Sequence, residues 1–360
     1  MIEPARTPVT YAASGVDIDA GERAVERIRP LVAATRRPEV VGDLGDFGGL
    51  FALDVARYRH PVLVGSTDGV GTKAVVAREA GRYGTIGIDL VAMCVDDLVC
   101  QGAEPLFLLD YVATGAVDPE RMTELVGGVA AGCAEVGAAL LGGEMAEHAG
   151  VLDRDEFDLV GFAVGVVERD AVLGSDRVRS GDVLLGLPSP GLRSNGYTLA
   201  RRVLLSDGRS LAEPAWDGAA TTLADELLLP SVLYAPAVLA AVAAAEVHAV
   251  SHITGGGIPG NLARVVPDGL VAVVERGTWS VPPIFGEIRR RGPVADDEMV
   301  RVFNVGLGMV VVVPPSSVED CLAALAAAGR AATVVGHVED GREPGRAAVE
   351  LVGPPLWEAP

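Results

Sequence analysis

Two kinds of pattern alternate along this chain of 360 residues, and the alternation limits what it can fold into. Val-rich runs broken by glycine, typical of strands, are followed by Ala- and Leu-rich stretches with helical spacing. With 49% apolar residues the chain can bury a large core, and its length indicates at least two domains. The sequence therefore predicts a mixed fold of α+β and α/β type, with a polar boundary at residues 170–182.

Composition argues against several partners. Lys and Arg total 29 against 49 Asp and Glu, a net charge of −20, so nucleic acid and anionic membranes are poor partners. The longest apolar stretch, residues 235–247, is too short to cross a bilayer, and no N-terminal signal is present. Cys94, Cys100, Cys133 and Cys321 lack C-x-x-C spacing and predict buried free thiols. We expect a cytoplasmic protein whose phosphate sites are local.

Residues 61–73 predict a buried strand that ends in a glycine turn. Gly69 and Gly71 let backbone N–H groups approach phosphate oxygens, and Lys73 adds a positive charge. Asp68 would repel a bare phosphate unless a cation lay between them. The turn therefore predicts a site for a magnesium nucleotide, and an ordinary Asp-Gly turn is the alternative.

Two commoner phosphate motifs fit this turn less well. A P-loop requires Ser or Thr after its lysine, whereas Thr72 comes before Lys73. A dinucleotide-binding turn requires an acid at the end of a second strand, yet Asp89 falls within a helical pattern.

Several further acidic residues are candidates for a functional site, but each is a weak candidate when taken alone. Asp96 and Asp97 lie in a predicted helix over residues 85–102 and could simply face water. Asp110 lies in an apolar strand, where a carboxylate must be hydrogen-bonded, bound to metal or at an exposed end. Glu144 follows Gly142 and Gly143 at a strand end, where sites in α/β sheets gather.

The second half carries two glycine-containing loops. Ser194 or Asn195 is expected to cap a helix that follows Gly196. Gly255, Gly256 and Gly257 precede a helix predicted over residues 262–266, and N–H groups there suit a phosphate. His252 is a candidate base or phosphate donor, although a structural role is commoner for such a histidine. Other strands are predicted at 104–114, 138–141, 158–168, 182–187, 305–313 and 332–338, and other helices at 119–137 and 317–329.

Together these segments resemble the phosphoribosylformylglycinamidine cyclo-ligase (aminoimidazole ribonucleotide synthetase) family over nearly the whole chain. The motifs that carry the resemblance are Gly-Val-Asp-Ile (15–18), Arg-Pro-Glu-Val (37–40), Thr-Asp-Gly-Val-Gly-Thr-Lys (67–73), Gly-Ile-Asp-Leu-Val-Ala-Met (87–93), Gln-Gly-Ala-Glu-Pro-Leu-Phe (101–107), Leu-Asp-Tyr (109–111), Gly-Gly-Glu (142–144), Ser-Asn-Gly-Tyr (194–197), Thr-Gly-Gly-Gly (254–257) and Phe-Asn-Val-Gly-Leu-Gly-Met (303–309).

The resemblance implies an ATP-dependent ring closure: formylglycinamidine ribonucleotide and ATP give aminoimidazole ribonucleotide, ADP and phosphate in purine biosynthesis. It implies an N-terminal ATP-binding and dimerisation domain (1–169), whose sheet pairs with that of a second subunit. A C-terminal α/β domain (170–345) and a tail (346–360) would follow. ATP and Mg²⁺ are the implied cofactors, with K⁺ as a further candidate, and a homodimer is the implied assembly.

Site residues follow from the resemblance position by position. Asp68, Asp97 and Glu144 match the metal-nucleotide acids, and Lys73 a phosphate contact, with Gly69, Gly71 and Thr72 in the same turn. Asn195 and Gly255, Gly256 and Gly257 match substrate or phosphate loops, and Lys73, His252 and Arg193 are the candidate catalytic residues.

Three loops depart from the family pattern. Asp43 and Asp46 replace glycines of a Gly-Gly-Leu-Gly-Gly-Phe loop, and Asp43 could bind a second Mg²⁺. Residues 143–150 carry Met145 and Ala149 where the family has a hydroxyl residue and a proline. Arg193 replaces the histidine of His-Ser-Asn-Gly; it keeps an anion contact but cannot exchange a proton.

These departures leave two alternatives: a paralogue that acts on a related ribonucleotide, and a nucleotide-binding protein without catalysis. Relatives in the wider superfamily fit less well. Selenophosphate synthetase has a reactive residue near its N-terminus, whereas the first cysteine here is Cys94. Hydrogenase-maturation relatives end in a cysteine, whereas this chain ends in Glu-Ala-Pro. The Gly-Asp-Asp loop of thiamine-phosphate kinase is only partly echoed by residues 42–46.

Overall fold

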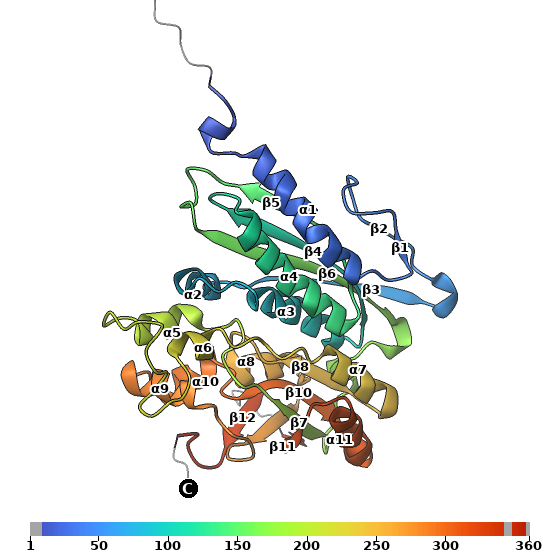
Figure 1. The fold of residues 1–360 in the computed structure, drawn as a ribbon. Coiled ribbons are helices and arrows are strands. Elements are labelled where there is room, and N and C mark those ends of the chain that lie inside the picture. Colours follow the sequence, from blue (N-terminus) through green and yellow to red (C-terminus); the bar gives the residue numbers. More distant parts are fainter. Residues whose placement is uncertain (1–8, 342–347, 358–360) are drawn as a thin grey trace, which may run out of the picture.

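The computed structural model describes residues 9–341 and 348–357. Two units, each built around its own sheet, are stacked on one another, and α3 lies between them (Figure 1). The mixed α and β fold is as predicted. The predicted boundary between residues 345 and 346, and the end of the predicted tail, lie outside the described residues.

The N-terminal unit holds a four-stranded sheet in the order β3-β6-β4-β5. Its strands are β3 (Pro61–Gly69), β4 (Glu104–Thr114), β5 (Ala139–Glu147) and β6 (Phe157–Glu168). Only β4 and β5 run parallel; the other neighbours are antiparallel. The helices of this unit are α1 (Ile18–Ala34), α2 (Lys73–Ala80), α3 (Ile86–Cys100) and α4 (Pro119–Val136), and β1 (Val40–Val41) pairs with β2 (Leu50–Phe51).

The ends of helix α4 were predictable because each is marked by residues in its own sequence. The Asp118 Oδ1 accepts hydrogen bonds from the backbone N–H of Glu120 (2.9 Å) and Arg121 (3.3 Å). Pro119 occupies the first helical position, where no backbone donor is needed, and Gly137 ends the helix with φ +71°. The predicted start and end of this helix are confirmed.

One face of the N-terminal sheet is open. Helices α1, α3 and α4 pack on the opposite face, while Leu63, Tyr111 and Phe162 are 61%, 39% and 44% exposed on the open one. The prediction that residues 61–69 form a buried strand is wrong, because β3 is an edge strand with alternating exposed positions. Its apolar residues suggested burial, but half of them point to the open face.

The C-terminal unit holds a six-stranded sheet in the order β12-β9-β11-β7-β10-β8. Only β12 and β9 run parallel. The strands are β7 (Val183–Pro188), β8 (Ala249–His252), β9 (Leu270–Glu275), β10 (Leu307–Val313), β11 (Thr333–Asp340) and β12 (Val349–Val352). The helices are α5 (Tyr197–Leu204), α6 (Leu223–Leu227), α7 (Ala235–Ala244), α8 (Gly257–Leu262), α9 (Pro283–Arg291), α10 (Asp296–Val302) and α11 (Val318–Ala327), and 3-10 turns occur at Ala12–Ser14, Val55–Arg57, Arg169–Ala171, Ser175–Arg177, Ala263–Val265 and Pro315–Ser317.

Three predictions for this half need correction. The predicted tail contains β12, which pairs with β9 and completes the sheet edge. Helix α8 begins at Gly257, inside the glycine run, rather than at residue 262, because Gly256 at φ +104° turns the chain directly into it. Neither Ser194 nor Asn195 caps α5, since Gly196 occupies the cap position at φ +77° without a side-chain bond.

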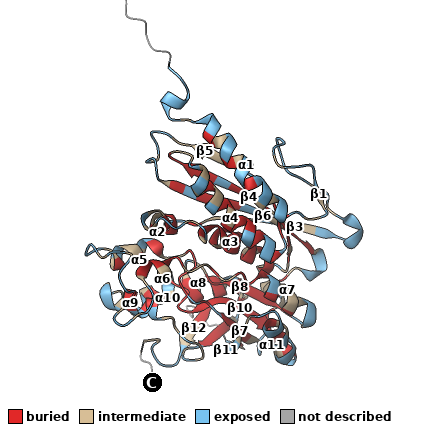
Figure 2. Ribbon diagram, in the orientation of Figure 1, coloured by how far each residue is buried: buried red, intermediate tan, exposed pale blue. Residues whose placement is uncertain are grey.

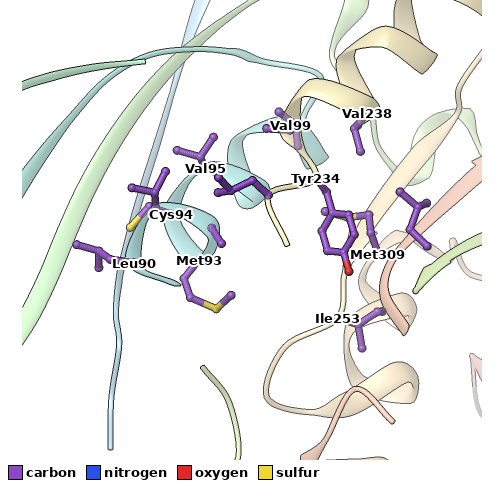
Figure 3. Packing of buried hydrophobic residues seen from close by; sticks show 14 of the residues in the cluster. Leu90, Met93, Cys94, Val95, Val99, Tyr234, Val238, Ile253 and Met309 are labelled. Atoms are coloured by element: carbon purple, nitrogen blue, oxygen red, sulfur yellow. The ribbon is translucent and has the colours of Figure 1, made fainter. Parts of the chain in front are cut away.

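Helix α3 joins the two units. Nearly all its residues are buried, including Asp89 and Asp96, because it packs on the N-terminal sheet and also contacts β8 and α7 (Figure 2). Leu90, Met93, Cys94, Val95 and Val99 of α3 lie on the side of the contact opposite to Tyr234, Val238, Ile253 and Met309 (Figure 3). One continuous core therefore spans both units.

Within residues 9–341 and 348–357, none of the helices combines the length and apolar character that a membrane crossing needs. The four cysteines are free thiols, and all except Cys100 are buried.

Candidate active site at the junction of the two units

The Asp68 turn lies at the end of β3, where the N-terminal sheet meets the second unit. The backbone N–H of Gly69 donates to the Asp68 Oδ1 at 2.7 Å, and Gly71 adopts φ +56°, which a residue with a side chain rarely adopts. Burial raises the pKa of Asp68; the Gly69 hydrogen bond opposes this, and the nearby Asp97 carboxylate adds to it. A cation between the two acids would relieve that repulsion.

Asp97 and His252 link the two units at this point. Asp97, on α3, is 46% exposed in its side chain, and its Oδ1 lies 2.8 Å from the Nδ1 of His252 at the end of β8. Asp68 interacts electrostatically with both residues. The structure thus brings Asp68, Asp97 and His252, all predicted from the sequence, into one group, called here the junction cluster.

Arg193 lies behind the junction cluster. Its Nη2 is 2.7 Å from the Asp96 Oδ2 and 2.9 Å from the His252 Nε2. A guanidinium can only donate, so the His252 Nε2 accepts, and the hydrogen of the neutral ring lies on Nδ1 and is donated to Asp97. Arg193 thereby selects the His252 tautomer that orients Asp97.

The buried position of Arg193 differs from the sequence-based expectation of an anion contact. Its side chain is 1% exposed, it donates to the backbone oxygen of Val232 at 2.9 Å, and its guanidinium lies 4.8 Å over the Tyr234 ring. The Asp96 Oδ1 meanwhile accepts from the backbone N–H of Tyr234 and Ala235 at the start of α7. Asp96 therefore fastens α3 to the second unit instead of facing water.

Lys73 also differs from its predicted role as a phosphate contact. The Nζ is fully buried, 2.6 Å from the Asp89 Oδ2, and it donates to the backbone oxygens of Arg193 (3.0 Å) and Leu229 (2.9 Å). An ammonium has three N–H groups, so these three acceptors leave none for a phosphate. Asp89 in turn accepts from the N–H and hydroxyl of Ser231.

A second group of acids lines a cavity in the N-terminal unit. This glycine-loop cavity, of about 510 Å³, is bounded by residues 43–49, by Asp110 and by residues 140–145. Burial raises the pKa of Asp110 to about 7, and its Oδ2 is buried without a hydrogen-bond partner. A Cβ on Gly143 would lie 1.8 Å from the Asp110 Oδ1, so this glycine makes room for the carboxyl group.

The four predicted metal ligands do not converge within one chain. Asp68 and Asp97 belong to the junction cluster, whereas Glu144 and Asp43 line the glycine-loop cavity. Asp43 is also paired with Arg36 at 2.7 Å. In the described ranges, no three His, Cys, Asp or Glu side chains are grouped as metal ligands.

The two predicted loops of the C-terminal unit do meet. A Cβ on Gly255 would lie 3.8 Å from the Asn195 Nδ2, and the Asn195 Oδ1 is buried without a partner. The Nδ2 of Asn261 donates to the Gly257 oxygen at 2.9 Å and holds the glycine loop. Thr72, from the Asp68 turn, lies 3.0 Å from Thr198 on α5, hydroxyl to hydroxyl.

The buried pairs Asp89–Lys73 and Asp96–Arg193 were not predicted from the sequence. A signal for them existed, because Asp89 and Asp96 are seven residues apart and share a face of α3. Two acids on one face of an otherwise apolar helix predict partners on whatever packs there.

Comparison with known proteins identifies the fold and the family. The profile "AIR synthase related protein, N-terminal domain" matches residues 53–167, and "AIR synthase related protein, C-terminal domain" matches residues 179–347. Among solved structures, a thiamine-monophosphate kinase from Stenotrophomonas maltophilia K279a superimposes with a TM-score of 0.67 at 19% identity, covering 92% of this chain and 96% of that one. A hydrogenase maturation protein HypE in complex with ATP gives 0.64 at 18% identity, covering 92% and 91%. At these identities the likeness establishes the fold only.

Curated relatives are much closer in sequence. The phosphoribosylformylglycinamidine cyclo-ligase of Myxococcus xanthus (strain DK1622) is 52% identical over 95% of this chain and 99% of its own length. The enzyme of the same name from Anaeromyxobacter dehalogenans (strain 2CP-C) is 52% identical over 96% and 99%. The resemblance seen in the motifs thus holds over both units, and the chain belongs to the phosphoribosylformylglycinamidine cyclo-ligase family.

Proposed function

We propose that this protein closes the imidazole ring of aminoimidazole ribonucleotide from formylglycinamidine ribonucleotide, using ATP and releasing ADP and phosphate. The observation that carries the proposal is the 52% identity, over almost the full length of both chains, with relatives that bear the name of this activity. The junction cluster supports it, because Asp68, from a motif that carries the family resemblance, lies beside Asp97 and His252, two further residues expected in the site, where the two units meet.

The chemical difficulty of the reaction is a poor leaving group, the oxygen of the formyl-derived amide. ATP phosphorylates this oxygen, a nitrogen of the amidine side attacks the carbon, and phosphate leaves in place of hydroxide. Such a transfer depends mainly on positioning and on charge neutralisation. The enzyme must therefore hold the γ-phosphate beside the amide oxygen and offset the negative charge between them.

Asp68 and Asp97 fit a Mg²⁺ carried by ATP. Both are oxygen donors, Asp97 is half exposed, and Mg²⁺ is usually held by one or two carboxylates together with phosphate oxygens. When bound, the ion would neutralise phosphate charge. His252 keeps Asp97 oriented through its Nδ1–H, and the contact of its Nε2 with Arg193 makes orientation, rather than proton transfer, its role.

A homodimer built through the open face of the N-terminal sheet completes the proposal. Leu63, Tyr111 and Phe162 expose apolar surface there, on neighbouring strands of one sheet. A Phe162→Glu substitution is expected to give a monomer in sedimentation experiments, whereas an exposed control, Val334→Glu, leaves the dimer intact. The free cysteines support a reducing compartment such as the cytoplasm.

The decisive experiment measures ADP and aminoimidazole ribonucleotide in the same samples, with Mg-ATP and formylglycinamidine ribonucleotide. Equal amounts of both products are expected. Asp68→Asn and Asp97→Asn should lose both products while remaining folded, and omission of Mg²⁺ should do the same. Exchange of K⁺ for Na⁺ tests the further predicted cation. ATP binding without either product would refute the proposal.

A further inference from the structure

A cavity of about 730 Å³ lies between α5, the loop that follows it, and the end of α2. One wall is a single face of α5, made by Thr198, Arg201 and Arg202 and continued by Leu205 just after the helix. Ser206, residues 208–211 and Glu79 form the rest. Helices α2 and α5 face each other across the junction (Figure 1), so the cavity opens between the two units. None of its lining residues belongs to the junction cluster.

The cavity is positively charged within a strongly acidic protein. Arg201, Arg202 and Arg209 line it against a single carboxylate, Glu79, whereas the whole chain carries a net charge of −20. Arg201 and Arg202 form no ion pair among the described residues, while many other arginines of the chain do. Arg209 lies 3.9 Å from the Glu213 carboxylate and 3.6 Å from that of Glu287, so the positive charge without a partner is that of Arg201 and Arg202.

Two guanidinium nitrogens of this lining are buried without an acceptor: the Arg201 Nε and the Arg209 Nη1. The Arg209 side chain is only 5% exposed, and its Nη2 is held by the backbone oxygen of Ala215 at 2.8 Å. Its Nη1 lies 3.6 Å from Glu287, too far for a hydrogen bond, and Glu287 already accepts from Arg290 at 2.7 Å. Burial also lowers the pKa of Arg209, which reflects a charge short of solvation.

Both nitrogens have almost no accessible surface, so a ligand in the cavity would meet the other guanidinium donors of Arg201 and those of Arg202. A guanidinium has no acceptor atom, so these donors of Arg201 and Arg202, which form no ion pair among the described residues, call for water or for a ligand rich in acceptors. Phosphate groups match the forked donors of arginine in charge and geometry, and the hydroxyls of Thr198, Ser206 and Ser210 add further donors. The cavity is larger than a lone phosphate needs and leaves space for an attached sugar.

We propose that the cavity lined by Arg201, Arg202 and Arg209 binds a phosphomonoester, with the phosphate on the arginines and the attached sugar in the remaining volume. The ligand is either the phosphate end of the ribonucleotide substrate or free phosphate. Only the first assignment rests on the proposed function, because binding itself can be measured without turnover.

The test measures binding of inorganic phosphate and of ribose 5-phosphate to the full-length protein by calorimetry. Arg201→Gln and Arg202→Gln are each expected to weaken binding about tenfold, the loss of one charge-assisted contact. Arg301→Gln, an exposed arginine on α10, is the matched control for net charge and should bind like the unmodified protein. Equal affinity in all four proteins, or an equal loss in the control, would overturn the proposal.

Steady-state kinetics separates the two sources of the phosphate. A raised KM for the ribonucleotide in Arg201→Gln, with kcat and the KM for ATP unchanged, identifies the cavity as the substrate's phosphate site. Weaker phosphate binding with unchanged kinetics identifies a site for free phosphate. If even the unmodified protein forms no product, the proposed function fails, yet the binding comparison still decides whether the cavity takes a phosphomonoester.

Discussion

Arg193 adopts the left-handed backbone region at φ +62°, which is uncommon for a residue with a side chain. Strain of this kind costs about 1–3 kcal/mol and persists where surrounding contacts enforce it. Here those contacts are the Asp96 ion pair, the Val232 oxygen and the Tyr234 ring. The arginine that replaces a histidine of the family pattern therefore comes with partners for both of its terminal nitrogens, while its Nε is buried without one. The paired terminal nitrogens argue that the site is adapted rather than decayed.

Removing the Arg193 charge is expected to destabilise the protein strongly. Arg193→Gln leaves the Asp96 carboxylate buried without its partner, which typically costs about 3–5 kcal/mol, measurable as the free energy of unfolding in urea. Asp96→Asn combined with Arg193→Gln removes both charges and should recover part of that loss. Additive losses in the double variant would show that the two side chains do not interact.

The junction also predicts a tautomer that can be observed directly. With Arg193 in place, ¹⁵N chemical shifts of His252 should report a neutral ring with its hydrogen on Nδ1. In Arg193→Gln the glutamine oxygen can accept a hydrogen bond, so the ring is free to change tautomer. A ring with its hydrogen on Nε2 in the unmodified protein would contradict the assignment.

Lys73 offers a chemical test, because it is the single lysine of the sequence. Its ammonium is fully buried and bound to Asp89, and burial lowers its pKa while Asp89 opposes the change. An amine-acetylating reagent should leave Lys73 unmodified in the folded protein and modify it once urea is added, as read by mass spectrometry. Rapid acetylation in the folded state would show that the amine is open to solvent and could contact a phosphate.

Strands β4 and β5 pair at Asp110 and Gly143, which buries the Asp110 carboxyl group. Its burial predicts that the free energy of unfolding depends on pH. The pKa of Asp110 is about 7 in the folded protein against 3.8 when unperturbed, so between these values the folded state holds a proton that the unfolded state has lost. The contribution of Asp110 to the free energy of unfolding is therefore highest below pH 4. It falls as the pH rises to 7, by roughly 4 kcal/mol at most.

Asp110→Asn removes this titration. The difference in unfolding free energy between the variant and the unmodified protein should grow from pH 4.5 to pH 7 and then level off, with the variant more stable at high pH. Asp158→Asn, an exposed aspartate on β6, is the control and should show no such trend. Parallel stability curves for Asp110→Asn and the unmodified protein would mean that Asp110 titrates normally.

Helices and strands whose sequence signals lie within their own residues could be predicted. Features that depend on packing against other parts of the fold could not. The cap at Asp118, the proline at position 119 and the glycine at 137 specify α4 within its own sequence. Residues 61–69 were predicted to be buried because the segment begins with a run of apolar residues, but the burial of a strand depends on what covers the sheet. Likewise, Asp68, Asp97 and His252 were predicted from the sequence. The two backbone oxygens that accept from Lys73 and the guanidinium that pairs with Asp96 were not, because they belong to the other unit, more than 90 residues away.

For the whole molecule, the sheet register separates the predicted metal ligands. Asp68, Gly161, Asp110 and Gly143 lie in one row across β3, β6, β4 and β5, so Asp68 and Glu144 are at opposite edges. Three strand spacings amount to about 14 Å, too far for one Mg²⁺ to bind both. Glu144 pairs with Tyr111 on the open face proposed for the dimer. If Glu144 serves the same metal-nucleotide site as Asp68, the second subunit must supply it.

Mixing inactive variants tests this sharing of sites. Asp68→Asn and Glu144→Gln are each expected to abolish product formation as homodimers. In a mixed dimer, both defects fall in one shared site, and the other site combines the intact Asp68 of one subunit with the intact Glu144 of the other. Random exchange makes half of the dimers mixed, so activity should return to about one quarter of the unmodified level. Sites confined to single chains would each keep one defect, and mixing would then restore nothing. Because the readout is recovery rather than loss, misfolding of either variant cannot imitate the expected result.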